Sequence, residues 1–484
     1  MCARTEPGSK GAKSAKTARQ SRGLRSGQLR FFRTIAQSVG VQGPTGAVVI
    51  AAAVLAGVSG GGTALVELVA AVAMGFVAYA FIIFTRGFNS AGSVYGFTGA
   101  VVGARFGFLS AWALMLVYVT FAGGICAAVA SEASAAVGYF GPALPWQTYA
   151  LTAYVLVMAL AFLEIKVSAG IILGLEGVSM LLVVVVCAVI VAKGGNHGNV
   201  LGPEPFQPNG VPLSVLGLGV VLTFSSFSGF EAATTLGEET QSPQKLIPWA
   251  IGLSLAVVAA FTIVATAIVT NAFPSTEALA SDPVPLVTLT NSYVADWVGE
   301  LVSIGATISA FGAALACVVG ASRILFAVGR DTGPTMLTTT TRAGAPAVAL
   351  IGVAAGSLVT LLLVLHEDLA TQAVAVSLGY GADLIIAAYI LVVVAAIIFN
   401  VRRRVSWIST AILVVGLAAL GYVVKVTFIP LPPSPFRIDA LAAAGTLVVG
   451  ILLPIVFPAV RRGIRDSALL KAGAEALLPR DPRP

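Results

Sequence analysis

Charge is scarce in this sequence, and so are the residues that usually hold metals or form disulfides. Only 10% of its 484 residues are charged, whereas a soluble domain carries about 25%. The two histidines and four cysteines have neither metal-ligand nor redox spacing, so we expect no metal site, no disulfide framework and no cofactor. The run Gly60–Gly62 lacks the Lys-Ser/Thr pair of a phosphate-binding loop, which argues against ATP as an energy source. These absences exclude most soluble enzymes and nucleic-acid binders.

Most of the chain consists of long apolar runs. Hydrophobic residues make up 57% of the chain, and the mean hydropathy is +0.95. A helix that crosses a bilayer needs about 20 apolar residues, and twelve stretches bounded by Gly, Pro or charged residues fit that description. They are residues 34–58, 63–85, 106–131, 148–163, 168–192, 213–236, 246–270, 298–328, 345–365, 369–399, 405–428 and 437–459. The sequence therefore predicts an all-α, polytopic membrane protein with 12 transmembrane helices in a lipid bilayer.

Lysine and arginine gather on one side of the predicted topology. Nine lie in residues 1–33, ten in loops on the same predicted side and six after residue 460, which makes 25 of the 28. Cytoplasmic loops carry such an excess, so we expect both termini in the cytoplasm and the protein in the plasma membrane. We divide the chain into a basic cytoplasmic tail (1–33), a ten-helix core (34–399), helices 11 and 12 (400–460) and a cytoplasmic C-terminal tail (461–484).

Two of the predicted helices contain residues that interrupt an α-helix. The first holds Gly43-Pro44-Thr45-Gly46, and the sixth holds the serine-rich and glycine-containing segment 225–231. Helices one and six are corresponding positions if ten helices form two five-helix halves, and paired interruptions there are typical of a secondary transporter's substrate site. Half-helix N-termini at such breaks offer free N–H groups to a carboxylate. The alternative is a proline kink with a small-residue packing stripe.

Three segments carry a family resemblance. The first is the predicted loop between helices two and three, the second is helix six with its following loop, and the third is the end of helix eight. Their residues are Arg86–Tyr95 with Arg105–Trp112, then Phe227–Ala233 with Gly237–Pro243 and Ile247-Pro248, and finally Ala321–Asp331. In this order the sequence resembles the amino acid–polyamine–organocation superfamily of permeases over most of the chain.

The resemblance implies the leucine-transporter fold, which is a 5+5 inverted repeat plus two further helices, and a substrate held by unwound parts of helices one and six. By position, Thr45 and Gly46 would meet the substrate carboxylate, and carbonyls around Phe227 and Ser228 would meet its amine. Phe230 would be a packing or gating aromatic, and Glu231 would couple the break to neighbouring helices. The expected substrate-binding residues are Gly43, Thr45, Gly46, Phe227, Ser228, Gly229, Phe230 and Glu231.

Carboxyls deep in a span are costly, so each is a functional hypothesis. We single out Glu176 of helix five, Glu231 of helix six and Asp383 of helix ten. Each can carry a proton through a transport cycle or pair with a cationic substrate. The structural alternatives are a hydrogen bond to freed amides for Glu231 and an N-terminal cap on an interrupted helix for Asp383. Glu176 lies one turn before Ser179, on the same helix face, and is the first candidate for coupling.

Two departures from the resembled family bear on mechanism. Ser179 stands where some proton-coupled members have a lysine, and Val117-Tyr118 stands where several cation-transporting members have an acid before the tyrosine. A coupling proton is our first expectation, and sodium is the alternative. A sodium ion needs oxygen ligands, which carbonyls near Gly43 and the hydroxyls of Thr307 and Ser309 in helix eight can supply. The same hydroxyls often serve only to pack helices.

The leading interpretation is a secondary active transporter that moves amino acids across the plasma membrane by alternating access, as a proton symporter or an exchanger. A polyamine or cationic-amine transporter is the alternative within transport, and an amino-acid sensor that does not transport is the alternative outside it. An enzyme would need a nucleophile with a base, or a metal set, at membrane depth, and the sequence presents neither.

Overall fold

A computed structural model describes residues 24–477, apart from residues 143, 164, 197, 283, 333–334, 343 and 432–435. Most of the predicted basic tail, residues 1–23, lies outside the described residues. Within the described part of the chain the secondary structure is helical, with one isolated β-bridge between Leu29 and Thr240.

Every apolar stretch predicted from the sequence coincides with a helix or with two helices that share a break. The long helices are α2 (Phe31–Gln42), α3 (Pro44–Ser59), α4 (Thr63–Gly87), α6 (Ala104–Phe140), α7 (Trp146–Ala161), α8 (Ile165–Lys193), α9 (Leu213–Ser226), α10 (Pro243–Ala272), α13 (Asp296–Thr332), α14 (Ala347–Val364), α15 (Ala370–Arg403), α16 (Trp407–Phe428) and α17 (Phe436–Val456). The shorter ones are α5 (Val94–Val101), η1 (Glu204–Phe206), η2 (Phe230–Leu236), α11 (Thr276–Ser281), α12 (Pro285–Tyr293), η3 (Thr335–Thr338), α18 (Pro458–Asp466) and α19 (Ala468–Leu477).

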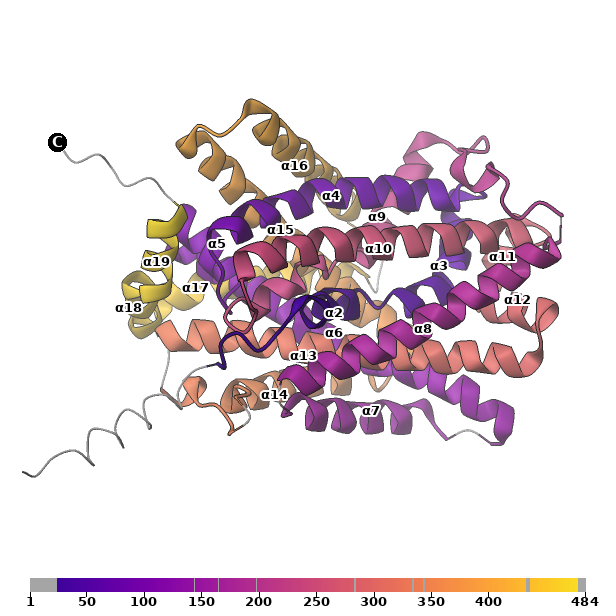
Figure 1. Cartoon of the computed structure of the whole chain (residues 1–484), viewed down its shortest axis with the longest axis horizontal. Coiled ribbons are helices and arrows are strands. Elements are labelled where there is room, and N and C mark those ends of the chain that lie inside the picture. The colour runs from indigo at the N-terminus through magenta and orange to yellow at the C-terminus, as the bar shows by residue number, and fades with distance from the viewer. Residues whose placement is uncertain are drawn as a thin grey trace, which may run out of the picture.

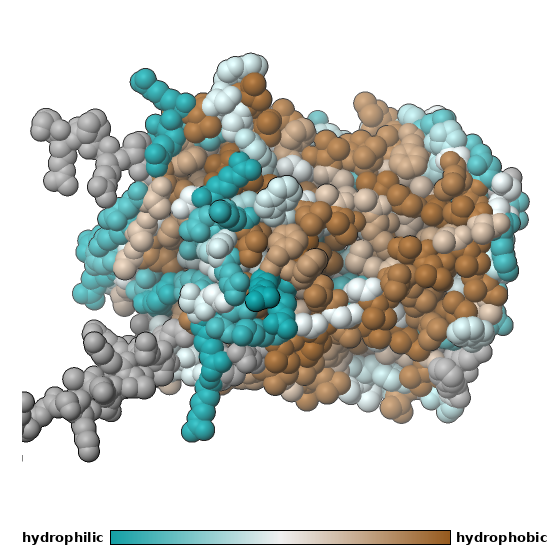
Figure 2. Space-filling view, in the orientation of Figure 1, coloured by the Kyte–Doolittle hydropathy of each residue, from teal (hydrophilic) through white to brown (hydrophobic). Residues whose placement is uncertain are grey.

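The helices are long and apolar enough to form a membrane bundle. Among the described residues, nine helices meet the length and hydropathy needed to cross a bilayer. The segments Phe31–Val49 and Ala52–Ser59, which are bent by 68°, make a tenth, broken span, whereas α7 and Leu213–Phe224 are apolar but shorter. Figure 2 shows a broad hydrophobic belt between a strongly hydrophilic end and a thinner hydrophilic rim at the other end. The all-α polytopic class is therefore confirmed, and the count of twelve crossings stays a prediction.

The two longest helices, α6 and α13, form the centre of the bundle. Each has 37 residues, they pack against one another, and α15 packs along α6 (Figure 1). Two adjacent glycines let α6 approach its neighbours closely. A Cβ on Gly123 would lie 2.5 Å from the carbonyl oxygen of Ser357 in α14, and one on Gly124 would lie 2.2 Å from the Cβ of Ser377 in α15. In lipid, where apolar burial adds little, such close backbone contact is what holds helices together.

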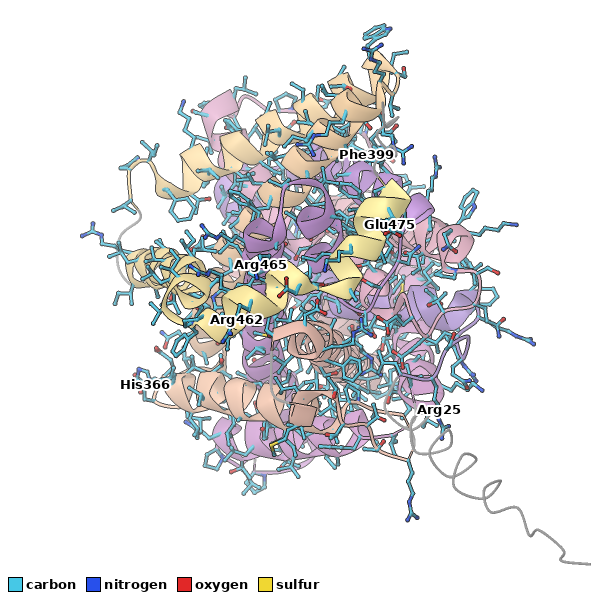
Figure 3. The ribbon with its side chains drawn as sticks, turned by 90° about the vertical axis from the view of Figure 1, so that its left-hand side faces the viewer. Arg25, His366, Phe399, Arg462, Arg465 and Glu475 are labelled. Atoms are coloured by element: carbon cyan, nitrogen blue, oxygen red, sulfur yellow. The ribbon has the colours of Figure 1, made fainter. Side chains whose placement is uncertain are left out.

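The C-terminal segment, predicted as a tail, is largely helical and packs against the end of the bundle. Figure 3 looks onto this end, where α18 and α19 lie across it with Arg462 and Arg465 on their surface. The Asp331 carboxylate at the end of α13 accepts hydrogen bonds from Tyr95 of α5, at 2.8 Å, and from Ser467 between α18 and α19. Burial and the adjacent Asp331 raise the pKa of Tyr95, so its hydroxyl stays a donor.

Apolar and backbone contacts complete the attachment of α19. Leu470 fills the space over Gly99 of α5, where a Cβ would lie 2.6 Å from the leucine, and Leu477 lies over Gly87 at the end of α4. Arg403 donates a hydrogen bond of 2.6 Å to the carbonyl of Leu477. This end of the chain is therefore part of the folded bundle.

Close packing at Gly123 gives the first prediction. We expect Gly123→Ala to lower the apparent melting temperature of the purified protein by several degrees, because the added methyl group meets a backbone oxygen that cannot rotate away. In Gly174→Ala, a glycine of α8 with open space around it, the better helix propensity of alanine leaves the melting temperature unchanged or higher. Thermal unfolding of both variants in one detergent is the measurement. Equal melting temperatures would contradict the packing argument.

Candidate functional site

The first break lies where the sequence predicts it, between α2 and α3. Gly43 adopts a left-handed conformation, with φ 51° and ψ 54°, and its N–H bonds back to the carbonyls of Val39 and Gly40. This turn ends α2, and Pro44 begins α3 at the position where a missing N–H costs nothing. The first N–H groups of α3 therefore face the break without intrahelical acceptors.

The second break follows α9 and lies directly beside the first. Gly229 has a φ of 107°, and a Cβ there would lie 2.6 Å from Val41 of α2. Ser38 of α2 connects the two breaks, because its hydroxyl donates to the carbonyl of Phe230 at 2.6 Å and accepts from the N–H of Ala233 at 2.9 Å. Backbone freed by one interrupted helix is thus satisfied by a side chain of the other.

Glu231 fixes the second break to α6 and α15. Its Oε1 accepts a hydrogen bond from Tyr118 of α6 at 2.7 Å, and its Oε2 accepts from Tyr389 of α15 at 2.7 Å and from the N–H of Gly229 at 3.0 Å. The side chain is fully buried. Phe230 packs edge-on against Phe81 of α4, with ring centroids 5.5 Å apart. Both residues therefore fix the break to surrounding helices.

A cavity of 330 Å³ lies at the paired breaks and extends toward the end of the bundle opposite the termini. Of the expected substrate-binding residues, four line it: Gly43, Gly46, Phe227 and Ser228. The other four, Thr45, Gly229, Phe230 and Glu231, lie outside its lining. The hydroxyl of Thr45 is buried and has no hydrogen-bond partner among the described residues. A larger hollow of 680 Å³ lies at the surface beside α18, and none of the expected substrate-binding residues lines it.

The residues expected to take part in coupling fall into two groups. Glu176 of α8 and Ser309 of α13 are brought together, since the serine hydroxyl lies 3.1 and 3.0 Å from the two carboxylate oxygens. Both side chains are buried. By contrast, the hydroxyls of Ser179 and Thr307 bond to carbonyls of their own helices, those of Leu175 and Ser303.

Asp383 lies elsewhere. It is half-buried near the middle of α15 and faces Asp439 of α17, outside the lining of the cavity. Tyr380, one turn earlier, bonds to Thr446 of α17 at 2.7 Å, so this side of α15 packs against α17. The alternative that Asp383 caps an interrupted helix is wrong, because α15 is continuous from Ala370 to Arg403.

Two carboxyls that line the cavity were missed by the sequence reasoning. Glu67 of α4 is only 2% exposed; its Oε1 accepts a hydrogen bond from Thr266 of α10 at 3.0 Å, and its Oε2 has no partner among the described residues. Glu132 of α6 lies one residue beyond the predicted helix end, but α6 continues to Phe140. For Glu67 a signal was present, since it lies inside the apolar stretch 63–85.

A buried ion pair separates the breaks from the end that carries the termini. Arg323 of α13 donates to the carboxylate of Glu239, which follows η2, at 3.0 and 3.4 Å, and both side chains are 1% exposed. Nearer the surface, Arg330 pairs with Glu238 at 2.9 Å. These two pairs join α13 to the segment that follows the second break, and they lie outside the cavity lining.

The Glu231 contacts give the second prediction. Glu231→Ala leaves the donors of Tyr118, Tyr389 and Gly229 buried without an acceptor, and each unpaired group costs about 1–3 kcal/mol. We expect it to lower the melting temperature clearly more than Tyr118→Phe, which removes one donor and leaves the carboxylate two others. A melting temperature for Glu231→Ala equal to that of Tyr118→Phe would show that the carboxylate does not hold the break.

The sequence also matches known proteins. It is 28% identical over 290 residues to the branched-chain amino acid permease BcaP of Bacillus subtilis, covering 56% of this chain and 61% of that protein. It is 26% identical over 322 residues to the cationic amino acid transporter 3, mitochondrial, of Arabidopsis thaliana, covering 63% and 52%. The chain thus spans about half to three-fifths of the relatives it matches.

The fold has a counterpart among solved structures. A manganese transporter of Eremococcus coleocola superposes with a TM-score of 0.53 at 12% identity, covering 91% of this chain and 98% of that one, and this likeness concerns the fold alone. The sequence profile described as amino acid permease matches residues 29–453, which include both breaks and the whole cavity lining. Permeases are transport proteins, in agreement with the expectation that the chain is not an enzyme. The chain belongs to the amino acid permease family.

Proposed function

We propose that this protein moves amino acids across the plasma membrane by alternating access, with both termini in the cytoplasm. The observation that carries the proposal is the cavity at two adjacent helix breaks, because it joins donors and acceptors at membrane depth. Family membership supports the transport class. The names of the relatives differ in the amino acids they mention, so they do not select one cargo.

The chemistry of the breaks suits the two charged groups common to all amino acids. Free N–H groups and the positive dipole end at the start of α3, near Thr45 and Gly46, attract a carboxylate. Carbonyls of the turn after α9, around Phe227 and Ser228, attract an ammonium group. The cavity, at 330 Å³, lies at the small end of the range for ligand sites, which suits a single small cargo molecule.

Alternating access requires the closed side to open. In this conformation Arg323–Glu239 and Arg330–Glu238 tie α13 to the chain after η2. Opening toward the termini must separate these pairs, and removing a partner from a buried pair is costly. A bound cargo shifts the equilibrium only through contacts that differ between the two states, and η2 connects the second break to the paired Glu238 and Glu239.

Glu176 is the residue that we propose for proton coupling. Its carboxyl is buried between α8 and α13 and touches the Ser309 hydroxyl, and no cationic side chain pairs with it in the described part of the chain. A buried carboxyl of this kind can take up and release a proton without room for a larger ion. Sodium is less favoured, since the Thr307 hydroxyl is engaged with its own helix and Ser309 with Glu176.

Counterflow in liposomes tests carriage separately from coupling, and this is the third prediction. With the purified protein in vesicles preloaded with mixed amino acids, we expect labelled amino acid to enter without any ion gradient. A pH gradient, acidic outside, should add concentrative uptake, and replacing sodium by potassium should change nothing. Glu176→Gln should keep counterflow and lose the pH-driven component.

Asp383→Asn is the comparison variant, because it neutralises another membrane-embedded carboxyl that lies outside the cavity lining. It should behave as the original protein. Loss of pH-driven uptake in Asp383→Asn, with Glu176→Gln unaffected, would transfer the coupling role to Asp383. Absence of counterflow for every amino acid, with the folded protein still binding them, would overturn transport in favour of a sensor.

A further inference from the structure

Helices α4 and α10 meet along a short row of polar contacts that contains one charged group. Nearest the end opposite the termini, the hydroxyls of Thr63 and Thr270 lie 2.7 Å apart. One turn deeper, Glu67 accepts from Thr266 at 3.0 Å, and a further turn deeper Thr262 lines the cavity together with Glu67. The Glu67 carboxylate therefore lies in the cavity wall, one turn below the hydroxyls of Thr63 and Thr270.

Glu67 is less well satisfied than Glu231, the carboxyl that binds the second break. Both oxygens of Glu231 have donors of their own, from Tyr118, Tyr389 and the N–H of Gly229. Glu67 has one donor, from a neutral hydroxyl, and its buried Oε2 has none among the described residues. A buried carboxylate without a counter-charge is strongly unfavourable. A group from outside the protein must therefore complete it when it is ionised.

The cavity supplies negative charge and no positive side chain. Glu132 joins Glu67 in the lining, and none of the described lining residues is Lys, Arg or His. Gln42 of α2, also in the lining, has a buried amide oxygen without a donor. Acceptors therefore predominate on this wall, and the ligand group that they suit is a cation with several hydrogens to donate.

We propose that Glu67 binds a second cationic group of the cargo, one at the far end of a long side chain. This rests on the proposed function, in which the breaks hold the amino acid's own carboxylate and ammonium. Leu55, which packs against Val66 beside Glu67, lines the same cavity as Gly46 at the first break. A cargo held at the breaks must reach Glu67 along this cavity with a cationic side chain, so the preferred substrates are amino acids such as lysine and ornithine.

The test is equilibrium binding to the purified, full-length protein, with lysine and norleucine as the matched pair. The two differ by the terminal ammonium group alone. We expect lysine to bind at least tenfold more tightly than norleucine. Glu67→Gln, which keeps the side-chain shape and the contact with Thr266, should abolish this preference by weakening lysine, while norleucine binding stays the same and shows that the variant is folded.

Glu300→Gln is the control, because Glu300 lies about one turn into α13 from the same end of the bundle and outside the cavity lining. It should keep the lysine preference. Equal binding of lysine and norleucine to the original protein, or an unchanged preference in Glu67→Gln, would overturn the cation site and leave amino acid transport standing. A preference lost equally in Glu300→Gln would overturn it too.

Cadaverine, which is lysine without its carboxylate, separates the two proposals. Binding of cadaverine as tight as that of lysine, and lost in Glu67→Gln, would support the cation site while overturning the amino acid proposal. Failure of lysine, norleucine and cadaverine all to bind the folded protein would overturn both.

Discussion

Two helices of this permease stop at membrane depth, and the backbone groups that they release have no water to bond with. Lipid offers no substitute, so the protein must supply every partner itself or leave the group facing a cavity. Ser38 and Glu231 answer this demand on one side of the breaks, by binding Phe230, Ala233 and Gly229. On the other side the groups face the cavity, where, in the proposed function, the cargo takes the place of the missing partners. The backbone N–H and C=O groups that the fold leaves without partners are therefore the groups available to bind a cargo.

The same constraint explains why buried carboxyls in one protein differ in role. Glu231 is surrounded by two tyrosine hydroxyls and a backbone N–H, so it fixes geometry and leaves little capacity for a ligand. Glu176 touches one serine between two long helices, where relative movement of α8 and α13 would change its surroundings. Glu67 also has one hydroxyl donor, but it faces the cavity, and its second oxygen has no partner among the described residues. The donors that each carboxylate meets and its contact with the cavity, more than its depth, distinguish these environments.

Sequence patterns predict the helices and both breaks of this protein well, because the signals are local. Apolar runs specify the helices, and Gly43-Pro44 and Gly229 specify where two of them stop, by the backbone conformations that only such residues take easily. Only four of the eight substrate-binding residues expected from the sequence line the cavity. Thr45 and Glu231 belong to the right segments but point behind the site, since side-chain direction at an irregular turn depends on the neighbouring helix.

Other features needed contacts between distant parts of the chain. Glu67 gains its significance from Thr266, which is 199 residues away, and from the depth of α4 within the bundle. Asp383 looked like a helix cap beside glycines, yet Gly381 packs closely under Phe121 of α6 and α15 runs through unbroken. A glycine at membrane depth can therefore mark either a break in its helix or a close contact with a neighbouring helix. Only the position of the neighbouring helix distinguishes the two.

The attachment of α19 also has a consequence for how the protein is made. The ribosome completes α5 early, but Leu470 and Leu477, which cover its glycines and the end of α4, are synthesised hundreds of residues later. At about 5–20 residues per second, the surface of α5 waits tens of seconds for its cover during translation. The end of the bundle that carries α19 is therefore finished last, and a chain that stops before Leu470 leaves Gly99 of α5 uncovered.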